Sequence, residues 1–337
     1  MNIDVTSFPA LVIREHGPGK FTKSIEQRLV GDLPVGEVLV EVHFSSLNYK
    51  DALSAAGNRG VTKKYPHTPG IDAAGIVVLS SVGTFLPGDE VIVSGYDLGM
   101  NTAGGFGRYI RVPAGWVMLR PRSLSIKTCM QIGTAGFTAA QSYLALQAMG
   151  VKPIQGPVLV TGATGGVGCV AVGLLKGAGY TVVAVTGKEK EHPWLRKLGA
   201  DDFLNREQAA IGSDRMLLRD RWAGVIDTVG GAILATAIKS TKYDGTVTCC
   251  GNAASGDLPL NVYPFILRGV KLVGIDSAQC PMRRRKEIWE KLANDWDLHF
   301  LDAMTSTIAL DELGEVIEQM LQGKAKGRTV IDLREET

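Results

Sequence analysis

The strongest chemical signal in the sequence is a cluster of glycines that follows an apolar segment. Residues 158–160 are Val-Leu-Val, residues 161–168 read T-G-A-T-G-G-V-G, and an apolar helical pattern covers 169–178. Glycine allows a backbone to approach an anion closely, and the start of a helix presents unpaired N–H groups and the positive end of its dipole. This strand, turn and helix predict a site for the pyrophosphate of a dinucleotide, with an ordinary tight turn as the alternative. The residues predicted to bind it are Thr164, Gly165, Gly166, Val167 and Gly168.

The end of the next expected strand indicates which dinucleotide fits. Sites for NAD usually place a carboxylate there, against the ribose 2′-hydroxyl. In this chain the strand ends in Thr186-Gly187-Lys188, and a hydroxyl, a turn amide and an ammonium group suit a 2′-phosphate. The sequence therefore favours NADPH, although Glu189 is adjacent and a solvated turn lysine is the alternative for Lys188. Arg206 is a second candidate for contact with the phosphate or the adenine, or else a surface arginine.

Five apolar segments that alternate with helical patterns would carry this site. The first is apolar almost throughout, as strands buried on both faces are, and this predicts a parallel sheet. Ligands bind at the carboxyl edge of such sheets, so Gly251, Asn252 and Ser277, which follow the last two segments, are expected next to the nicotinamide. The expected strands cover 158–162, 181–185, 224–228, 246–250 and 271–275.

A different pattern precedes and follows this region. Residues 10–14, 37–44 and 90–94 form short alternating segments, which are typical of half-buried antiparallel strands. The segment 305–333 is expected to be extended, helical and extended again, and to rejoin the first domain. The sequence thus predicts an α/β protein, with residues 1–127 and 303–337 in a discontinuous β-rich domain and 128–302 in a parallel α/β domain.

Composition and charge exclude several classes of protein. The chain has 337 residues, of which 45% are hydrophobic and 21% charged, so it can bury a large core. A formal net charge of +2 disfavours a nucleic-acid partner. The sequence has no run of about 18 apolar residues and no signal-peptide pattern at its start, so we expect neither a membrane span nor export. Five cysteines without C-x-x-C spacing fit the cytoplasm, and scattered cysteines and histidines predict no metal site.

Four ordered motifs are typical of one superfamily. They are P-H-T-P-G-I-D-A-A-G-I-V at 66–77, P-G-D-E-V at 87–91, G-G-F-G-R-Y at 104–109 and G-T-A-G-F-T-A at 133–139, followed by the glycine cluster. With them the chain resembles the medium-chain dehydrogenase/reductase superfamily over essentially its whole length. The resemblance implies a GroES-like β domain split around a Rossmann doubly wound domain, with the cofactor in the cleft between them.

Two stretches separate the chain from the metal-dependent members of that superfamily. Zinc alcohol dehydrogenases carry an early cysteine and a later Gly-His-Glu, where this chain has Asn48-Tyr49-Lys50-Asp51 and Gly70-Ile71-Asp72. The chain therefore resembles the zinc-free quinone oxidoreductase and enoyl reductase branch, in which no Lewis acid polarises an alcohol.

Four further motifs narrow the resemblance. S-L-N-Y-K-D-A-L at 46–53, T-G-K at 186–188, D-T-V-G-G at 227–231 and P-F-I-L-R-G-V-K-L-V-G-I-D-S at 264–277 resemble the acryloyl-CoA reductase (AcuI/YhdH) group. This implies NADPH-dependent reduction of an activated C=C bond, acryloyl-CoA to propanoyl-CoA, with hydride transfer to the β-carbon and no metal. The alternatives are an NADPH-dependent quinone or enone oxidoreductase, and a non-catalytic protein that binds NADPH.

The resemblance also implies roles for individual residues. Tyr49 and Asn48 are the expected catalytic residues, and Tyr49 is expected to contact the cofactor or the substrate. Proton delivery by Tyr49 and a buried structural tyrosine are both open. Arg328 resembles a position that faces the cofactor, and Asp72 is expected to order the backbone or Lys50.

A basic run opens the helix expected after the last parallel strand. Arg283, Arg284 and Arg285 oppose the helix dipole, which favours anions at that end, so we expect a compensating anion such as the phosphates of CoA. The alternative is a solvated helix face with pairs such as Glu287 and Lys291. The resemblance further implies a homodimer, with 271–275 as its edge strand.

Overall fold

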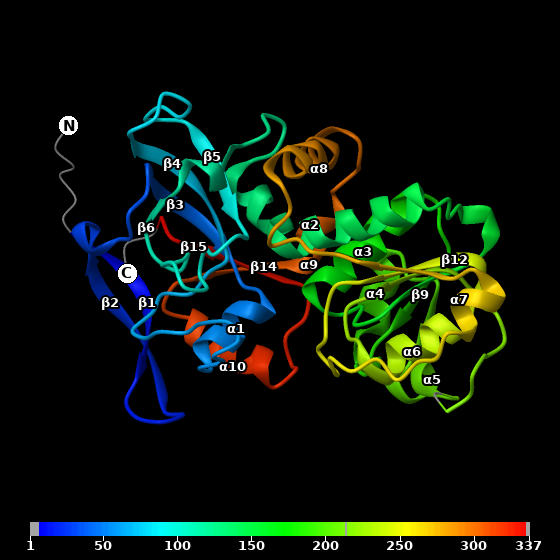
Figure 1. Ribbon diagram of the computed structural model, residues 1–337. Coiled ribbons are helices and arrows are strands. Elements are labelled where there is room, and N and C mark those ends of the chain that lie inside the picture. Colours follow the sequence, from blue (N-terminus) through cyan, green and yellow to red (C-terminus); the bar gives the residue numbers. More distant parts are fainter. Residues whose placement is uncertain (1–6, 213, 335–337) are drawn as a thin grey trace. The chain divides into compact units, whose positions relative to one another are not determined.

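The computed structural model describes residues 7–212 and 214–334, which form two compact units (Figure 1). Unit 1 contains the described residues of 1–134, 278–294 and 305–337, and unit 2 those of 135–277 and 295–304. No helix in the described part of the chain is long and apolar enough to cross a membrane.

Unit 1 is built on a sheet of seven strands. Their order is β14-β15-β3-β4-β5-β7, with β6 paired to β3, and β14 and β15 are the one parallel pair among these described strands. The tail therefore rejoins the β-rich unit as predicted, and α10 (Leu313–Leu321) connects its two strands. The strands are β3 (Val38–Ser46), β4 (Asp72–Ser80), β5 (Glu90–Ser94), β6 (Tyr109–Val112), β7 (Val117–Leu119), β14 (Thr305–Ala309) and β15 (Arg328–Asp332).

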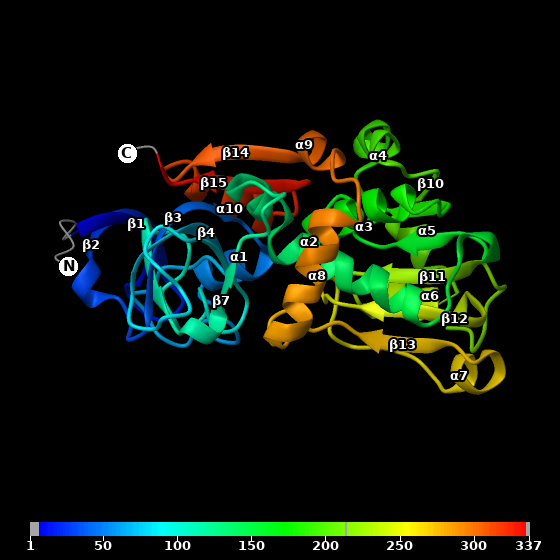
Figure 2. The same ribbon diagram turned by 90° about the horizontal axis from the view of Figure 1, so that it is seen from above.

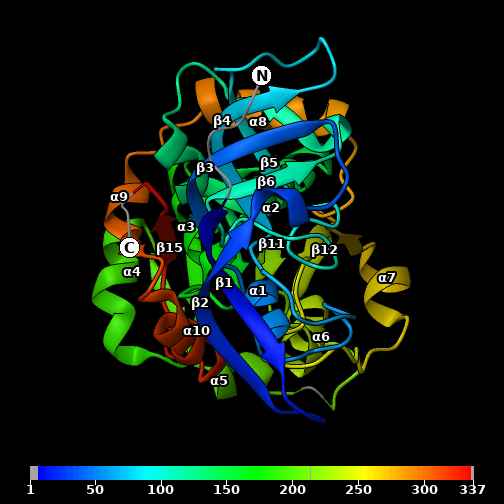
Figure 3. The ribbon, with the colours of Figure 1, turned by 90° about the vertical axis from the view of Figure 1, so that its left-hand side faces the viewer.

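A second, two-stranded sheet covers part of this core. The strands β1 (Ser7–Glu15) and β2 (Phe21–Leu29) form a long antiparallel hairpin (Figure 3). Val38, Val40 and Val42 of β3 are buried, as the alternating pattern predicts. Leu39, on the opposite face of β3, is buried too, because Phe8 of the hairpin packs with it in a separate apolar cluster.

Two helices of unit 1 matter for function. The helix α1 (Tyr49–Ala55) follows β3, and α8 (Met282–Asn294) follows the last strand of unit 2. The helix α8 belongs to unit 1, whereas the predicted division assigns it to the 128–302 domain. Tyr96 explains part of this attachment, since its backbone N–H donates to the carbonyl of Ala278 at 2.8 Å and its ring lies 5.0 Å from the guanidinium of Arg285.

Unit 2 contains a parallel sheet of six strands in the order β10-β9-β8-β11-β12-β13. This confirms the doubly wound fold, whose ligand crevice lies where the strand order reverses, between β8 and β11. The helix α7 lies beside β13 at one edge of the sheet (Figure 2). The strands are β8 (Val158–Val160), β9 (Val182–Val185), β10 (Asp202–Leu204), β11 (Trp222–Asp227), β12 (Thr241–Cys249) and β13 (Lys271–Gly274).

Helices connect these strands. Helix α3 packs against β8 and β9, and α6 packs against β11 and β12. The long helix α2 enters unit 2 from unit 1 and is interrupted at Gly133, which has a φ of 49°. The helices are α2 (Ile126–Ala148), α3 (Gly166–Gly177), α4 (His192–Leu198), α5 (Arg206–Ala210), α6 (Gly231–Lys239), α7 (Tyr263–Arg268) and α9 (Phe300–Met304).

Candidate functional site

The glycine cluster joins β8 to α3 as the sequence predicts. Gly162 has a φ of 61°, and a Cβ there would lie 2.3 Å from the Oγ1 of Thr228. A Cβ at Gly168 would lie 2.4 Å from the carbonyl oxygen of Gly162, so neither position accepts a side chain. Because α3 begins at Gly166, its first N–H groups have no acceptor within the helix. The loop therefore has the construction of an anion site at a helix N-terminus.

A buried carboxylate fixes the facing turn at the end of β11. Asp227 accepts hydrogen bonds from the Oγ1 of Thr161 at 2.7 Å and from the N–H groups of Val229 and Gly230 at 3.2 and 2.8 Å. Burial raises the pKa of its carboxyl group. Asp227 opens the D-T-V-G-G motif, from which its role could not be predicted, and it holds the ends of β8 and β11 together.

The end of β9 gathers the residues predicted for a 2′-phosphate. Thr186 is buried, and its Oγ1 accepts the N–H of Lys188 at 3.0 Å and lies 3.4 Å from the Oγ1 of Thr164. A Cβ at Gly187 would lie 2.9 Å from the Nε of Arg206, so that arginine's side chain lies against the turn. The structure thus brings two cations, Lys188 and Arg206, to the end of one strand, and Glu189 starts the short helix that follows.

The other predicted nicotinamide neighbours lie at strand ends of unit 2. Gly251 follows β12, and a Cβ there would lie 2.3 Å from the carbonyl oxygen of Thr228, which places this turn against the end of β11. Asn252 is exposed beside it. Ser277 is the last residue of unit 2 before α8 and is half-buried.

In unit 1 the predicted catalytic pair lies at the start of α1. Asn48 caps the helix, and Tyr49 is its first residue. The side chain of Tyr49 is 45% exposed, so it is not a buried structural tyrosine. Asn48 is buried, and its side-chain amide nitrogen lies 2.8 Å from the Oδ2 of Asp72.

Two buried carboxylates occupy the stretches where zinc enzymes of the resembled superfamily carry ligands. The oxygens of Asp51 accept N–H groups of Asn48, Gly70 and Ile71 at 2.8, 3.1 and 2.9 Å. Those of Asp72 accept side-chain or backbone donors on unit 1 as well. These carboxylates are engaged by N–H and O–H donors, an arrangement that does not fit a zinc site, and no group of three or more metal-ligating side chains occurs among the described residues.

Arg328 is buried in the same region of unit 1. Its Nε donates to the carbonyl of Gln131 at 3.0 Å, and its two terminal nitrogens lie 3.4 Å from the carbonyls of Leu47 and Met130. The bonds to Gln131 and Met130 satisfy carbonyls just before the interruption of α2 at Gly133. Contact of Arg328 with the cofactor stays a prediction.

The three arginines of α8 do not form one basic surface. Arg283 is exposed and paired with Glu287 at 3.2 Å, and Arg284 is exposed. Arg285 is only 2% exposed and donates to the Oγ of Ser94 at 3.0 Å. Burial and this bond disfavour Arg285 as a contact for CoA phosphates, which stays a prediction for the arginines of α8. Helical periodicity could have shown this burial, since the buried residues of α8 are Arg285, Ile288, Trp289 and Leu292.

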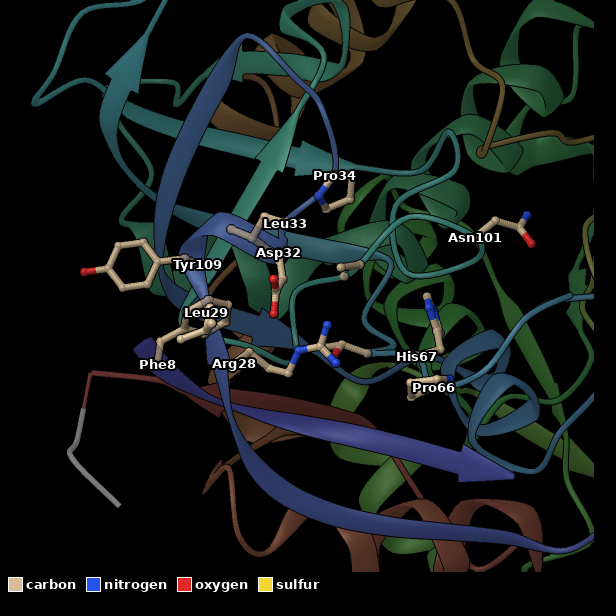
Figure 4. Close-up of a pocket in the computed structure, with 13 residues that line it drawn as sticks. Phe8, Arg28, Leu29, Asp32, Leu33, Pro34, Pro66, His67, Asn101 and Tyr109 are labelled. Carbon is tan, nitrogen blue, oxygen red and sulfur yellow. The ribbon is translucent and has the colours of Figure 1, made fainter. Parts of the chain in front are cut away.

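A pocket of about 140 Å³ also lies in unit 1 (Figure 4). Its lining includes the oppositely charged Arg28 and Asp32, the turn after β2, and residues 66–68 and 101–104 in part. The residues predicted from the sequence to bind cofactor or substrate are not among those that line it.

Comparison with known proteins gives relatives over almost the full chain. The family model of the alcohol dehydrogenase GroES-like domain matches residues 34–122, and that of the zinc-binding dehydrogenase matches 166–294. Acrylyl-CoA reductase AcuI of Ruegeria pomeroyi is 42% identical over 97% of this chain and 99% of its own length. Putative quinone oxidoreductase YhfP of Bacillus subtilis is 42% identical over 90% of this chain and 92% of its own length.

Solved structures agree with these sequence relatives. The yhdH oxidoreductase of Salmonella enterica, solved in complex with NADP, superposes with a TM-score of 0.94 at 41% identity, covering 97% of this chain and 100% of that one. The structure of Bacillus subtilis YhfP, solved with NAD bound, gives a TM-score of 0.93 at 40% identity, covering 98% and 100%. The two solved relatives therefore differ in the dinucleotide that they hold.

Proposed function

The chain belongs to the medium-chain dehydrogenase/reductase superfamily, in the group of the AcuI and YhdH reductases, and from this premise we propose that it reduces acryloyl-CoA to propanoyl-CoA with NADPH. The observation that carries the choice of cofactor is the end of β9, where Lys188 follows in the turn, the side chain of Arg206 lies against Gly187 and no carboxylate ends the strand. Two cations favour a 2′-phosphate through charge-assisted hydrogen bonds.

The glycine loop of unit 2 supports the same cofactor. The loop at 162–168 leaves room for a pyrophosphate because side chains are excluded at both of its ends. Thr164, Gly165, Gly166, Val167 and Gly168 would hold that group, with Gly251, Asn252 and Ser277 near the nicotinamide. When bound, NADPH supplies the hydride and its electron pair.

The remaining tasks fall to the protein. A thioester enolate oxygen must be stabilised while the β-carbon accepts a hydride, and the α-carbon must then receive a proton. Tyr49, exposed at the start of α1, is the proposed contact to the substrate or the proton source. Of the predicted CoA contacts, Arg283 and Arg284 remain the proposed ones, since both are exposed.

The test is NADPH oxidation with acryloyl-CoA, crotonoyl-CoA and 1,4-benzoquinone in parallel, with NADH as the control cofactor. We expect acryloyl-CoA to exceed the quinone in kcat/KM by roughly 100-fold or more, because CoA offers charges that a quinone lacks. A higher kcat/KM for the quinone would favour the second candidate, a quinone or enone oxidoreductase, which the similarity to YhfP supports. Absence of turnover with every acceptor would favour the non-catalytic alternative.

We also propose that the protein is a cytoplasmic homodimer. The strand β13 is an edge of the parallel sheet, and Leu272 on it is 37% exposed. Ile266 and Leu267 lie on α7, which precedes β13 in the chain. They are 67% and 58% exposed and add apolar surface. Sedimentation equilibrium should give a dimer that Leu272→Glu weakens, whereas Leu119→Glu, at an exposed leucine of unit 1, should leave it intact. A monomeric wild type would contradict this proposal.

A further inference from the structure

The side-chain amide of Asn48 is fully engaged inside unit 1. Its nitrogen lies 2.8 Å from the Oδ2 of Asp72, 3.2 Å from the carbonyl of Ser46 and 3.4 Å from the Oδ2 of Asp51. Its oxygen lies 3.5 Å from the guanidinium of Arg328. An amide nitrogen has two hydrogens to donate, and three acceptors already surround this one. Asn48 is therefore placed to hold the backbone rather than to donate to a substrate.

Asp72 connects three separate parts of unit 1. Its Oδ2 accepts the hydroxyl of Ser46 at 2.7 Å, the amide of Asn48 at 2.8 Å and the N–H of Thr134 at 2.8 Å. Its Oδ1 accepts the hydroxyl of Thr134 at 2.6 Å. The side chain is fully buried, so these four bonds replace water and join the end of β3, the cap of α1 and the second part of α2.

Asp51 closes this network from the other side. It accepts the N–H of Asn48 at 2.8 Å, and its second oxygen accepts the N–H groups of Gly70 and Ile71, the two residues that precede Asp72. The first turn of α1 is thus bonded to the segment that carries Asp72. Gly133 packs on the same group, since a Cβ there would lie 2.7 Å from the Oδ2 of Asp72.

We propose that Asp72 and Asp51 are positioning residues, which act through Asn48 to fix the backbone that presents Tyr49. Tyr49 directly follows Asn48, and its ring is the exposed group at this end of α1. The inference rests on the proposed function, because it requires Tyr49 to act in the reduction. It assigns to Asp72 a role in hydrogen-bond geometry and not in charge or proton transfer.

The chemistry of an amide distinguishes geometry from charge. In Asp72→Asn the amide oxygen can take the place of Oδ2 and accept the same three donors, while the amide nitrogen donates to the hydroxyl of Thr134, which can accept. All four bonds survive without the negative charge. In Asp72→Ala all four are lost.

The experiment is steady-state kinetics with acryloyl-CoA and NADPH on these two variants. We expect Asp72→Ala to lower kcat roughly 10- to 100-fold, because a displacement of Tyr49 by about 1 Å has that effect, with the KM for NADPH changed less than about twofold. Asp72→Asn should restore kcat to within about threefold of the wild type. Loss of activity in Asp72→Asn equal to that in Asp72→Ala would overturn the proposal, as would an unchanged kcat in Asp72→Ala.

A matched control lies on the same helix. Ser54 is a buried serine of α1 whose hydroxyl lies 2.7 Å from the Oγ1 of Thr62, outside the network, so Ser54→Ala should leave kcat unchanged. If Asp72→Ala does not fold, the double variant Ser46→Ala/Thr134→Val replaces it, since it removes both hydroxyl donors and keeps the carboxylate. That variant should lower kcat about 10-fold, and an unchanged kcat would count against the proposal.

A second readout separates this inference from the proposed function. Hydrogen–deuterium exchange of residues 47–53 needs no substrate, and it should rise in Asp72→Ala but not in Asp72→Asn or Ser54→Ala. If the wild type fails to reduce acryloyl-CoA while exchange follows this pattern, the proposed substrate is wrong and the network stands. If exchange is the same in all variants, the positioning role is wrong whatever the substrate.

Discussion

The buried carboxyl group of Asp51 should make stability depend on pH in an unusual direction. Burial, and secondarily the charge of Asp72, raises the pKa of Asp51 from 3.8 to about 7. A shift of about three units corresponds to about 4 kcal/mol. Between about pH 4 and pH 7 the folded protein retains a proton that the unfolded chain has released, so the free energy of unfolding falls as the pH rises through this window.

The perturbation that isolates this effect is Asp51→Asn, which cannot ionise. The variant loses an acceptor for the N–H groups around position 51, and it is therefore less stable than the wild type at low pH. As the pH rises from 4 to 8, only the wild type incurs the penalty of a buried charge. The difference between their free energies of unfolding should shrink by up to about 4 kcal/mol, as measured by urea midpoints at a series of pH values.

Asp332 provides a control of opposite sign. Its pKa lies below the usual value, first because of the hydrogen bond from the guanidinium of Arg334. The stability that ionised Asp332 contributes is present above about pH 4 and is lost as the pH falls below it. The difference in free energy of unfolding between Asp332→Asn and the wild type should therefore grow as the pH rises to about 4. If the difference in free energy of unfolding between Asp51→Asn and the wild type also grows as the pH rises, the raised pKa of Asp51 is refuted. Its three N–H donors would then outweigh burial and keep the carboxylate ionised.

Four further substitutions test the cofactor and substrate assignments. Gly168→Ala places a Cβ 2.4 Å from the carbonyl oxygen of Gly162 and should weaken NADPH binding at least about 10-fold in a fluorescence titration. Lys188→Ala should raise the Kd of NADPH roughly 10-fold and leave that of NADH within about twofold, and equal effects on both would remove Lys188 from the phosphate site. Arg285→Ala should lower the melting temperature without a selective change in the KM for acryloyl-CoA, whereas Arg284→Ala should raise that KM with little effect on melting.

Local patterns in the sequence predicted the parts of the fold that depend on neighbours along the chain. The glycine loop follows from glycines between a strand and a helix, and the buried residues Val38, Val40 and Val42 follow from the alternation of a strand. Leu39 shows the limit of that alternation. It lies on the other face of β3 and is buried because the separate two-stranded sheet of β1 and β2 covers it, which period-two patterning alone does not indicate.

The candidate site shows the same limit for charged residues. Arg283 and Arg285 are the same residue type at the same end of a helix, so the sequence predicts one role for both. Arg283 is exposed, whereas Arg285 is only 2% exposed because it shares the helix face of Ile288 and Trp289. The helical periodicity of α8 indicates this burial, whereas the charge of the arginine run does not.

No periodicity in the sequence indicates which hydrogen-bond partners the carboxylates of unit 1 have. Asp72 was expected to order the backbone, which is part of what it does, but its partners come from positions 46, 48 and 134. Such a set exists only after two strands have paired and α2 has been interrupted at Gly133. The positioning role proposed for Asp72 therefore rests on bonds within its own chain, and it is a property of the fold and not of any motif in which the residue stands.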